Sequence, residues 1–199
     1  MPRITVGITG ASGQLYARRL LRALAVCRGH DGVDLVVSQQ ARVALDEELD
    51  VGREGPLDLA ALVGGEAGHI RLHDNGDVAA PIASGSQRSL GMVIVPCSMA
   101  TVARVAGGVS DSLLTRAADV CLKESRRLIL VARESPLSIV HLRNLLAAAE
   151  AGATILPASP PLYHRPKTVD DMVDQILARV LDHLGLDHEL GRRWRSVDV

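Results

Sequence analysis

The residues whose types and spacing could do chemistry begin with a short turn near the start of the chain, Gly10-Ala11-Ser12-Gly13. Alternate positions before it, from Ile4 to Ile8, are β-branched and apolar, which predicts a buried strand, and a helical pattern begins at Gln14. A strand, a small-residue turn and a helix in this order leave backbone N–H groups at the positive end of the helix, where a phosphate could bind. The same residues would also suit a tight turn that needs small side chains only to pack. This segment alone favours neither interpretation.

Strand and helix patterns alternate along the rest of the chain. Further strands are predicted over 33–37, 92–95, 128–131 and 154–156, and helices over 14–27, 41–49, 112–124, 138–151 and 169–184. Glycines punctuate residues 51–75, where 57–63 fits a short helix and 69–72 a strand. The alternation predicts an α/β protein with one mostly parallel sheet between two layers of helices. We expect a single domain over 1–199, with a core over about 3–184 and a C-terminal tail over 185–199.

Sheets of this kind bind ligands beyond the carboxyl ends of their strands. Here those ends carry residues 10–13, Ser38, residues 96–98 and the pair Arg133-Glu134. We therefore expect these segments to meet at one rim of the sheet. Small, hydroxyl and charged residues gathered in this way favour a nucleotide as the ligand.

The composition limits the partners. A formal net charge of −1 supplies no field that would attract nucleic acid or an anionic membrane. No apolar run approaches bilayer length, and the N-terminus has no signal pattern. The three cysteines show neither a CxxC pair nor a metal-binding spacing, which suits a reducing compartment. We expect a soluble cytoplasmic protein with no bound metal.

Several common nucleotide sites are not favoured. From residue 7 the glycines are spaced Gly-x-x-Gly-x-x-Gly rather than Gly-x-Gly-x-x-Gly, and the second strand ends in Ser38 rather than in an acidic residue, so nicotinamide binding has little support. Tyr163 and Lys167 are spaced as in some dehydrogenases, but Pro166 prevents the helix that would bring them together. There is no phosphate-binding loop ending in Gly-Lys-Ser/Thr, so ATP hydrolysis has no support.

A series of short motifs runs along the chain between about residues 4 and 194. They are Gly10-Ala-Ser-Gly13, Ala83-Ser-Gly-Ser86, Met92-Val-Ile-Val-Pro-Cys-Ser98, Arg116-Ala-Ala-Asp-Val-x-Leu-Lys123-Glu, Arg133-Glu-x-Pro136, His141-Leu and Tyr163-His-x-Pro166. Each is weak evidence alone. Together, and in this order, they resemble the flavin prenyltransferase family of the UbiX type, within the flavodoxin-like group of homo-oligomeric flavin-containing cysteine decarboxylases.

The resemblance implies a reaction and an assembly. Members transfer a dimethylallyl group from dimethylallyl monophosphate to N5 and then C6 of reduced FMN, without a metal ion. The product, prenylated FMN, would serve a partner decarboxylase in ubiquinone synthesis or aromatic acid breakdown. The family also implies a Rossmann-like, flavodoxin-like fold and a homo-oligomer, a dodecamer, whose active sites are shared between subunits.

The resemblance assigns roles to residues as well. For FMN it implies Gly10, Ala11, Ser12, Ser38, Ser98, Met99, Ala100, Thr101 and Arg116, with the four residues from Ser98 on a loop. For the substrate phosphate it implies Lys123, Tyr163 and Arg179, with Arg133 beside them. For catalysis it implies Ser12, Glu48, Lys123 and Glu134. Of these, Glu134 would relay a proton during ring closure, and Ser12 would orient the N5 region of the flavin.

The chain departs from the family pattern in three places, one of which is Lys123-Glu-Ser-Arg-Arg127, where relatives show Lys-Glu-Arg-Arg-Pro. Gln39 stands where relatives commonly carry lysine, and Val78 where some carry an aromatic residue, which bears on the preference for the prenyl donor. Two other functions share the fold. A flavin-dependent cysteine decarboxylase would carry a Pro-x-Met-Asn motif and a catalytic histidine, and neither is found. A non-enzymatic subunit that binds flavin for a decarboxylase would have no need of the retained catalytic and substrate-binding residues.

Overall fold

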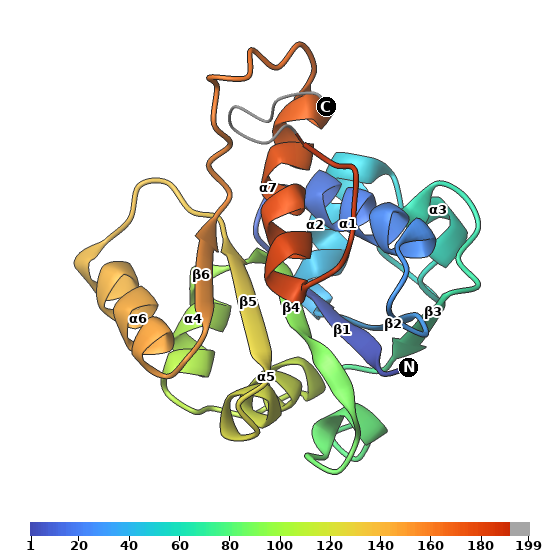
Figure 1. The fold of residues 1–199 in the computed structure, drawn as a ribbon. Helices are drawn as coiled ribbons and strands as arrows, with labels where there is room; N and C mark the ends of the chain where they lie inside the picture. Colours follow the sequence, from blue (N-terminus) through green and yellow to red (C-terminus); the bar gives the residue numbers. More distant parts are fainter. Residues whose placement is uncertain (192–199) are drawn as a thin grey trace.

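The computed structural model describes residues 1–191, so the expected tail over 185–199 lies partly outside the described residues (Figure 1). Six strands form one sheet in the order β3-β2-β1-β4-β5-β6, and every pairing is parallel. The strands are β1 (Arg3–Ile8), β2 (Val33–Val37), β3 (Ile70–His73), β4 (Ser89–Cys97), β5 (Arg127–Ala132) and β6 (Thr154–Pro157). The predicted α/β class with a parallel sheet is confirmed.

Helices cover both faces of the sheet. On one face lie α1 (Gln14–Val26), α2 (Gln39–Leu49), α3 (Leu59–Val63) and α7 (Val169–Leu184). On the other lie α4 (Met99–Ala106), α5 (Leu113–Lys123), α6 (Ile139–Glu150) and a short 3-10 turn, η1 (Pro81–Ala83). Strand β4 shows how the sequence builds both layers: Met92 and Ile94 belong to one apolar core, Val93 and Val95 to the other. This alternation accounts for the unbroken apolar run in that strand.

Helix α4 corrects one expectation. The residues after Ser98 were expected to form a loop, but they form the first turn of a helix. Ser98 is its N-cap, and its Oγ accepts the N–H of Thr101 at 3.4 Å. Buried Met99, Val102 and Val105 recur at helical spacing and pack into the core. With only eight residues, the pattern is too short to stand out in the sequence.

The ends of β1 and β4 are tied together at the point where the sheet order reverses. Thr9 Oγ1 donates to the carbonyl oxygen of Pro96 at 2.7 Å and accepts the N–H of Ser98 at 2.8 Å. On the other side of β1, the N–H of Ser38 donates to the carbonyl oxygen of Ile8 at 3.0 Å. The segments that follow two such strands lead to opposite faces of the sheet, and this leaves a crevice at the carboxyl ends of the strands.

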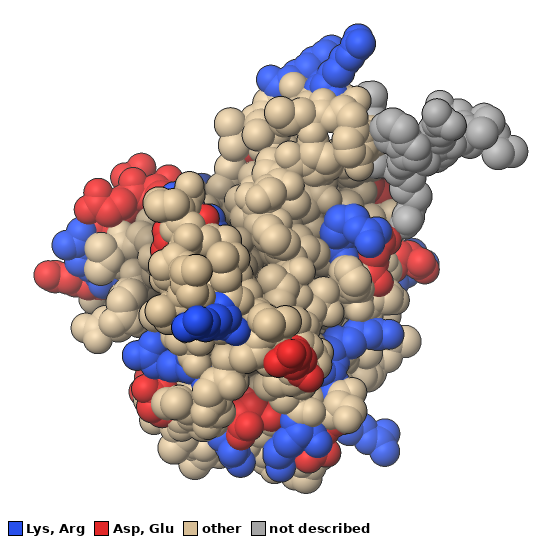
Figure 2. Space-filling view, turned by 90° about the vertical axis from the view of Figure 1, so that its left-hand side faces the viewer, with Lys and Arg blue, Asp and Glu red and all other residues tan. Residues whose placement is uncertain are grey.

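Helix α6 lies on the outside of the molecule with its apolar side chains exposed. Ala148 is its only buried residue, whereas Ile139, Val140, Leu142 and Leu146 are 65, 61, 51 and 60% exposed. Figure 2 faces this side of the molecule and shows a broad uncharged area there. An apolar patch of this kind on a protein surface marks a site of association.

Candidate active site at the carboxyl ends of the strands

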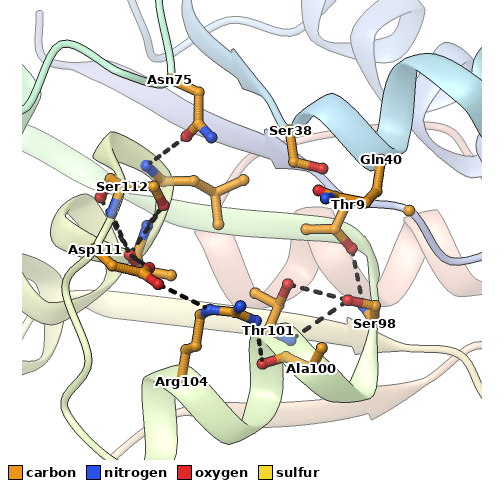
Figure 3. Close-up of a pocket in the computed structure, with 13 residues that line it drawn as sticks. Thr9, Ser38, Gln40, Asn75, Ser98, Ala100, Thr101, Arg104, Asp111 and Ser112 are labelled. Carbon is orange, nitrogen blue, oxygen red and sulfur yellow. Dashed lines mark hydrogen bonds and ion pairs between the residues drawn. The ribbon is translucent and has the colours of Figure 1, made fainter.

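A cavity of about 460 Å³ lies at the carboxyl ends of β1, β2 and β4 (Figure 3). Three helices, α2, α4 and α5, begin at its wall. Each is capped by a serine, Ser38, Ser98 or Ser112, whose Oγ accepts a backbone N–H from the first helical turn. The volume is within the range of small-molecule sites. The cavity therefore has the size of a ligand site and a wall rich in hydroxyl groups.

The N-terminus of α4 offers the cavity free donors. Ser98 Oγ and Thr101 Oγ1 lie 3.1 Å apart, so the two hydroxyls share a hydrogen bond. Within residues 1–191, the backbone N–H groups of Met99 and Ala100 have no hydrogen-bond partner. Free amides at the positive end of a helix, next to two hydroxyls, form a suitable site for a phosphate.

Gly10 brings the first turn and α2 into direct contact. A Cβ at this position would lie 2.6 Å from Cβ of Gln40, which is closer than two non-bonded carbon atoms can approach. Any side chain would therefore push α2, and with it Ser38, away from the cavity. The glycine is required for close packing of backbone on backbone.

The N-terminus of α1 differs, because a carboxylate of the protein occupies it. Glu48 accepts the N–H of Gly13 at 3.0 Å with each of its oxygens, and its Oε2 also accepts the N–H of Gln14 at 2.7 Å. Sequence analysis left open whether this turn binds phosphate or only packs. The amides of Gly13 and Gln14 are already bonded to a protein group, so the structure favours the packing role for them.

The structure gathers part of the expected FMN site. Gly10, Ser38, Ser98, Ala100 and Thr101 all line the cavity. Ala11 is buried in the adjacent turn and Ser12 is exposed there, while Met99 packs into the core. The expectation that the ends of β1, β2 and β4 meet at one rim is confirmed.

Arg116, also expected at FMN, is not part of the cavity wall. It lies on α5, and its Nη1 donates to Asp119 Oδ2 at 2.9 Å. Its role toward a ligand stays a prediction.

Lys123 lies at the edge of the sheet opposite the cavity. It is the last residue of α5, roughly 15 Å along the helix axis from the first. The following segment returns to the start of β5, where Arg126 donates to the carbonyl oxygens of Gly85 and Gln87 just before β4. The Lys123 ammonium is 3.4 Å from Glu124. A single chain does not bring Lys123 to its own cavity.

Arg133 and Glu134 follow β5 at the rim. The N–H of Arg133 donates to the carbonyl oxygen of Cys97, at the end of β4, at 3.2 Å. Both side chains are exposed, and Glu134 Oε1 accepts the N–H of Ser135 at 2.9 Å. They stand beside the cavity without lining it.

Tyr163 and Arg179 are also apart from the cavity wall. Tyr163, 58% exposed, lies in the segment between β6 and α7, with its ring centroid 4.3 Å from that of His164. Arg179, on α7, donates to Asp182 at 2.7 Å. The four residues expected to bind the substrate phosphate therefore do not meet within one chain.

Some residues of the cavity wall were missed by sequence analysis. These are Thr9, Gln40, Asn75, Arg104, Asp111, Ser112, Leu114 and Thr115. The Ser112 position could have been found, because a serine directly before a helical pattern is an N-cap signal. Asn75 had no such signal, since it lies in a glycine-rich stretch without periodicity.

The buried cysteines are poor nucleophiles. Burial raises the pKa of the Cys97 thiol, at the end of β4, far above its usual range, and raises that of Cys121 to about 11. Both are therefore thiols at neutral pH, and a thiolate is the reactive form.

Within residues 1–191, no group of three or more His, Cys, Asp or Glu side chains is placed to hold a metal ion. No helix in the same range has the length and apolar character to cross a membrane.

Comparison with known proteins identifies the family. Residues 1–181 match the flavoprotein family, and a flavin prenyltransferase UbiX from Alkalihalophilus pseudofirmus is 48% identical over 192 residues, which are 96% of this chain and 95% of that protein. This chain is a flavoprotein of the flavin prenyltransferase family. The crystal structure of AnUbiX (PadA1), in complex with FMN and dimethylallyl pyrophosphate, matches this flavoprotein with a TM-score of 0.86 and 40% identity over 99% of both chains. A dodecameric FMN-dependent UbiX-like decarboxylase from Escherichia coli O157:H7 matches with a TM-score of 0.85 and 42% identity, over 98% of this chain and 100% of that one.

Proposed function

We propose that this flavoprotein binds reduced FMN in the cavity and transfers to its N5 and C6 a dimethylallyl group from dimethylallyl monophosphate. The observation that carries the proposal is the N-terminus of α4, where two free amides and the hydroxyls of Ser98 and Thr101 meet at a cavity of about 460 Å³. This donor set fits the phosphate of FMN. With few aromatic residues in the chain, the flavin ring would rest on small side chains and backbone. The product, prenylated FMN, would serve a partner decarboxylase.

Four exposed polar residues, brought together from more than one copy of the chain, would act on the prenyl donor. Lys123, Tyr163, Arg133 and Arg179 offer cations and a hydroxyl for its phosphate, and each charge-assisted contact contributes roughly 1.5–3 kcal/mol. The carbon–oxygen bond of the donor would break and phosphate would leave, while a bond to flavin N5 forms and N5 loses its proton. Closing the ring would then add a proton to the double bond of the prenyl group, join the other carbon of that bond to C6, and release the proton of C6, which Glu134 would accept.

Ser12 and Glu48 would act at the first turn. Ser12 is exposed there, where its hydroxyl could orient the N5 region of the flavin. Glu48 holds this turn through the amides of Gly13 and Gln14. Its contribution to catalysis would therefore include positioning Ser12.

We infer that two copies of the chain build each active site. Lys123 lies at the opposite edge of the sheet from the cavity of its own chain, so it can serve only a neighbour's cavity. The exposed apolar side of α6 supports association, and the matched relative from Escherichia coli is dodecameric. We expect a homo-oligomer, with a dodecamer as the assembly.

Mass spectrometry of the extracted flavin tests the reaction. After anaerobic incubation with reduced FMN and dimethylallyl monophosphate, the flavin should gain the mass of the added prenyl group. Recovery of unmodified FMN would contradict the proposed transfer and favour a flavin-carrying subunit. Oxidative decarboxylation of a peptide with a C-terminal cysteine, in a separate assay that supplies oxidised FMN as the electron acceptor, would point to the cysteine decarboxylases instead.

Subunit complementation tests the shared site. Lys123→Ala and Glu134→Gln should each be inactive alone, because each removes one required group from every site. Mixed oligomers of the two variants should regain activity, since some cavities with an intact Glu134 then meet an intact Lys123 of a neighbour. The double variant mixed with either single variant is the control, and it should stay inactive. Mixed oligomers that form, as native mass spectrometry would show, but remain inactive would contradict the shared site.

A further inference from the structure

Asn75 connects the segment after β3 to the start of α5. Its backbone carbonyl oxygen accepts the N–H of Leu113 at 2.8 Å, and its Oδ1 accepts the N–H of Leu114 at 3.1 Å. The third amide of α5, that of Thr115, donates to Ser112 Oγ at 3.4 Å. All three amides of this helix end are thus bonded to protein groups. Unlike α4, α5 presents no amide of its first turn to the cavity.

The bond to Leu114 fixes the orientation of the Asn75 amide. Only the oxygen of the side chain can accept that N–H, so the Nδ2 amino group must point the other way. Figure 3 shows Nδ2 on the side of Asn75 that faces Ser38 across the cavity. Within the described part of the chain, Nδ2 has no hydrogen-bond partner, and the residue is half-buried. A donor held in place and partly removed from water favours an acceptor from a ligand.

We propose that Asn75 is a ligand-binding residue that donates from Nδ2 to an oxygen of the ribityl phosphate chain of FMN. The inference rests on the proposed function, because that function places FMN in this cavity. Ser38 lines the opposite wall, so an oxygen-rich chain between the two would meet donors on both sides. The chemistry recognised is a hydrogen-bond acceptor, either a phosphate oxygen or a ribityl hydroxyl.

Asn75→Asp separates this contact from the structural role of the residue. One carboxylate oxygen can still accept the N–H of Leu114, and a negative charge at a helix N-terminus is favourable, so the unfolding temperature should not fall. The other oxygen replaces the donor with a charged acceptor, which repels a phosphate oxygen but can still accept from a ribityl hydroxyl. If the partner is the phosphate, the dissociation constant of FMN, from quenching of its fluorescence, should rise at least about tenfold in Asn75→Asp; if it is a hydroxyl, that rise should appear in Asn75→Ala instead. Asn144→Asp, on α6, is the matched control for the added charge and should bind FMN as the wild type does.

Asn75→Ala completes the series. It removes both the donor and the acceptor, so it should lower the unfolding temperature as well as the affinity for FMN. Riboflavin, which lacks the phosphate, identifies the oxygen. A contact with the phosphate predicts that Asn75→Asp and Asn75→Ala weaken FMN alone, and a contact with a ribityl hydroxyl predicts that Asn75→Ala weakens both flavins.

Two results would overturn the inference, and they are distinguishable. If the wild type binds FMN and folded Asn75→Asp and Asn75→Ala both bind it equally well, the inference is wrong and the proposed function stands. If the wild type binds no FMN, the proposed function fails and the inference fails with it.

Discussion

Two helix N-termini flank the same crevice, and they differ in whether a carboxylate of the protein is bound to them. The first turn leads from β1 into α1, and Ser98 leads from β4 into α4. At α1 the carboxylate of Glu48 occupies the amides of Gly13 and Gln14. At α4 no described carboxylate does so, and Ser98 and Thr101 add hydroxyls to free amides.

The difference shows when a helix end can bind a ligand. The partial positive charge at a helix N-terminus attracts any anion within reach, including one from the protein itself. Where a side-chain carboxylate of the protein accepts the free amides, the helix end has only a structural role. Where only hydroxyl groups lie beside the helix end, its amides remain free to bind a phosphate. In this flavoprotein one end holds the turn that carries Ser12, and the other provides the proposed phosphate site.

Removing the hydroxyls at the open end should have the largest effect. Ser98→Ala combined with Thr101→Val deletes two donors, and hydrogen bonds to charged groups contribute about 1.5–3 kcal/mol each. The dissociation constant of FMN, measured by fluorescence titration, should rise roughly a hundredfold or more. Ser98→Ala also removes a helix cap, so Thr168→Ala, which removes the cap of α7, is the control. It should lose stability without losing affinity. An unchanged dissociation constant in the double variant would show that the phosphate does not bind at α4.

Gly10→Ala should disturb the crevice through the packing of the first turn against α2. The new Cβ would lie 2.6 Å from Cβ of Gln40, and overpacking of this kind costs about 1–3 kcal/mol. We expect a lower free energy of unfolding, from urea denaturation, and weaker FMN binding because Ser38 moves with α2. Gly68→Ala is the control, since a Cβ there meets no atom within 4 Å. Equal free energies of unfolding for the two variants would mean that α2 can shift to accommodate the new Cβ without loss of stability.

Glu48→Gln should have the smallest effect on folding and sharpens the comparison most. Glutamine keeps an acceptor for the amides of Gly13 and Gln14 but loses the charge, so the free energy of unfolding should fall by about 0.3–1 kcal/mol. FMN affinity should stay within about twofold, because α4 is untouched, while prenyl transfer should slow because the turn with Ser12 is held less firmly. Glu66→Gln, at an exposed position, is the charge control. A large gain of FMN affinity in Glu48→Gln would instead place the phosphate at α1, because the variant removes a negative charge that competes for the same amides.

The elements predicted best are those with a complete periodic pattern. β2 and α7 have the bounds that the sequence indicated, because five apolar-rich residues and a sixteen-residue amphipathic pattern are unambiguous. Helix α4 was missed because eight residues carry too little periodicity. For the site, Ser38 and Ser98 could be placed at one rim from sequence, since the carboxyl ends of parallel strands lie at the same edge of a sheet.

By itself, then, the sequence determined the parallel α/β fold, the rim at which Gly10, Ser38 and Ser98 meet, and the family to which the motifs belong. Only the tertiary structure decided which helix end is open, because Glu48 reaches the first turn from 34 residues away. It also decided that Asn75 faces the cavity and that Lys123 does not. The reason is common to all three: local periodicity predicts which face of an element is buried, but the partner that a polar group meets depends on segments distant along the chain.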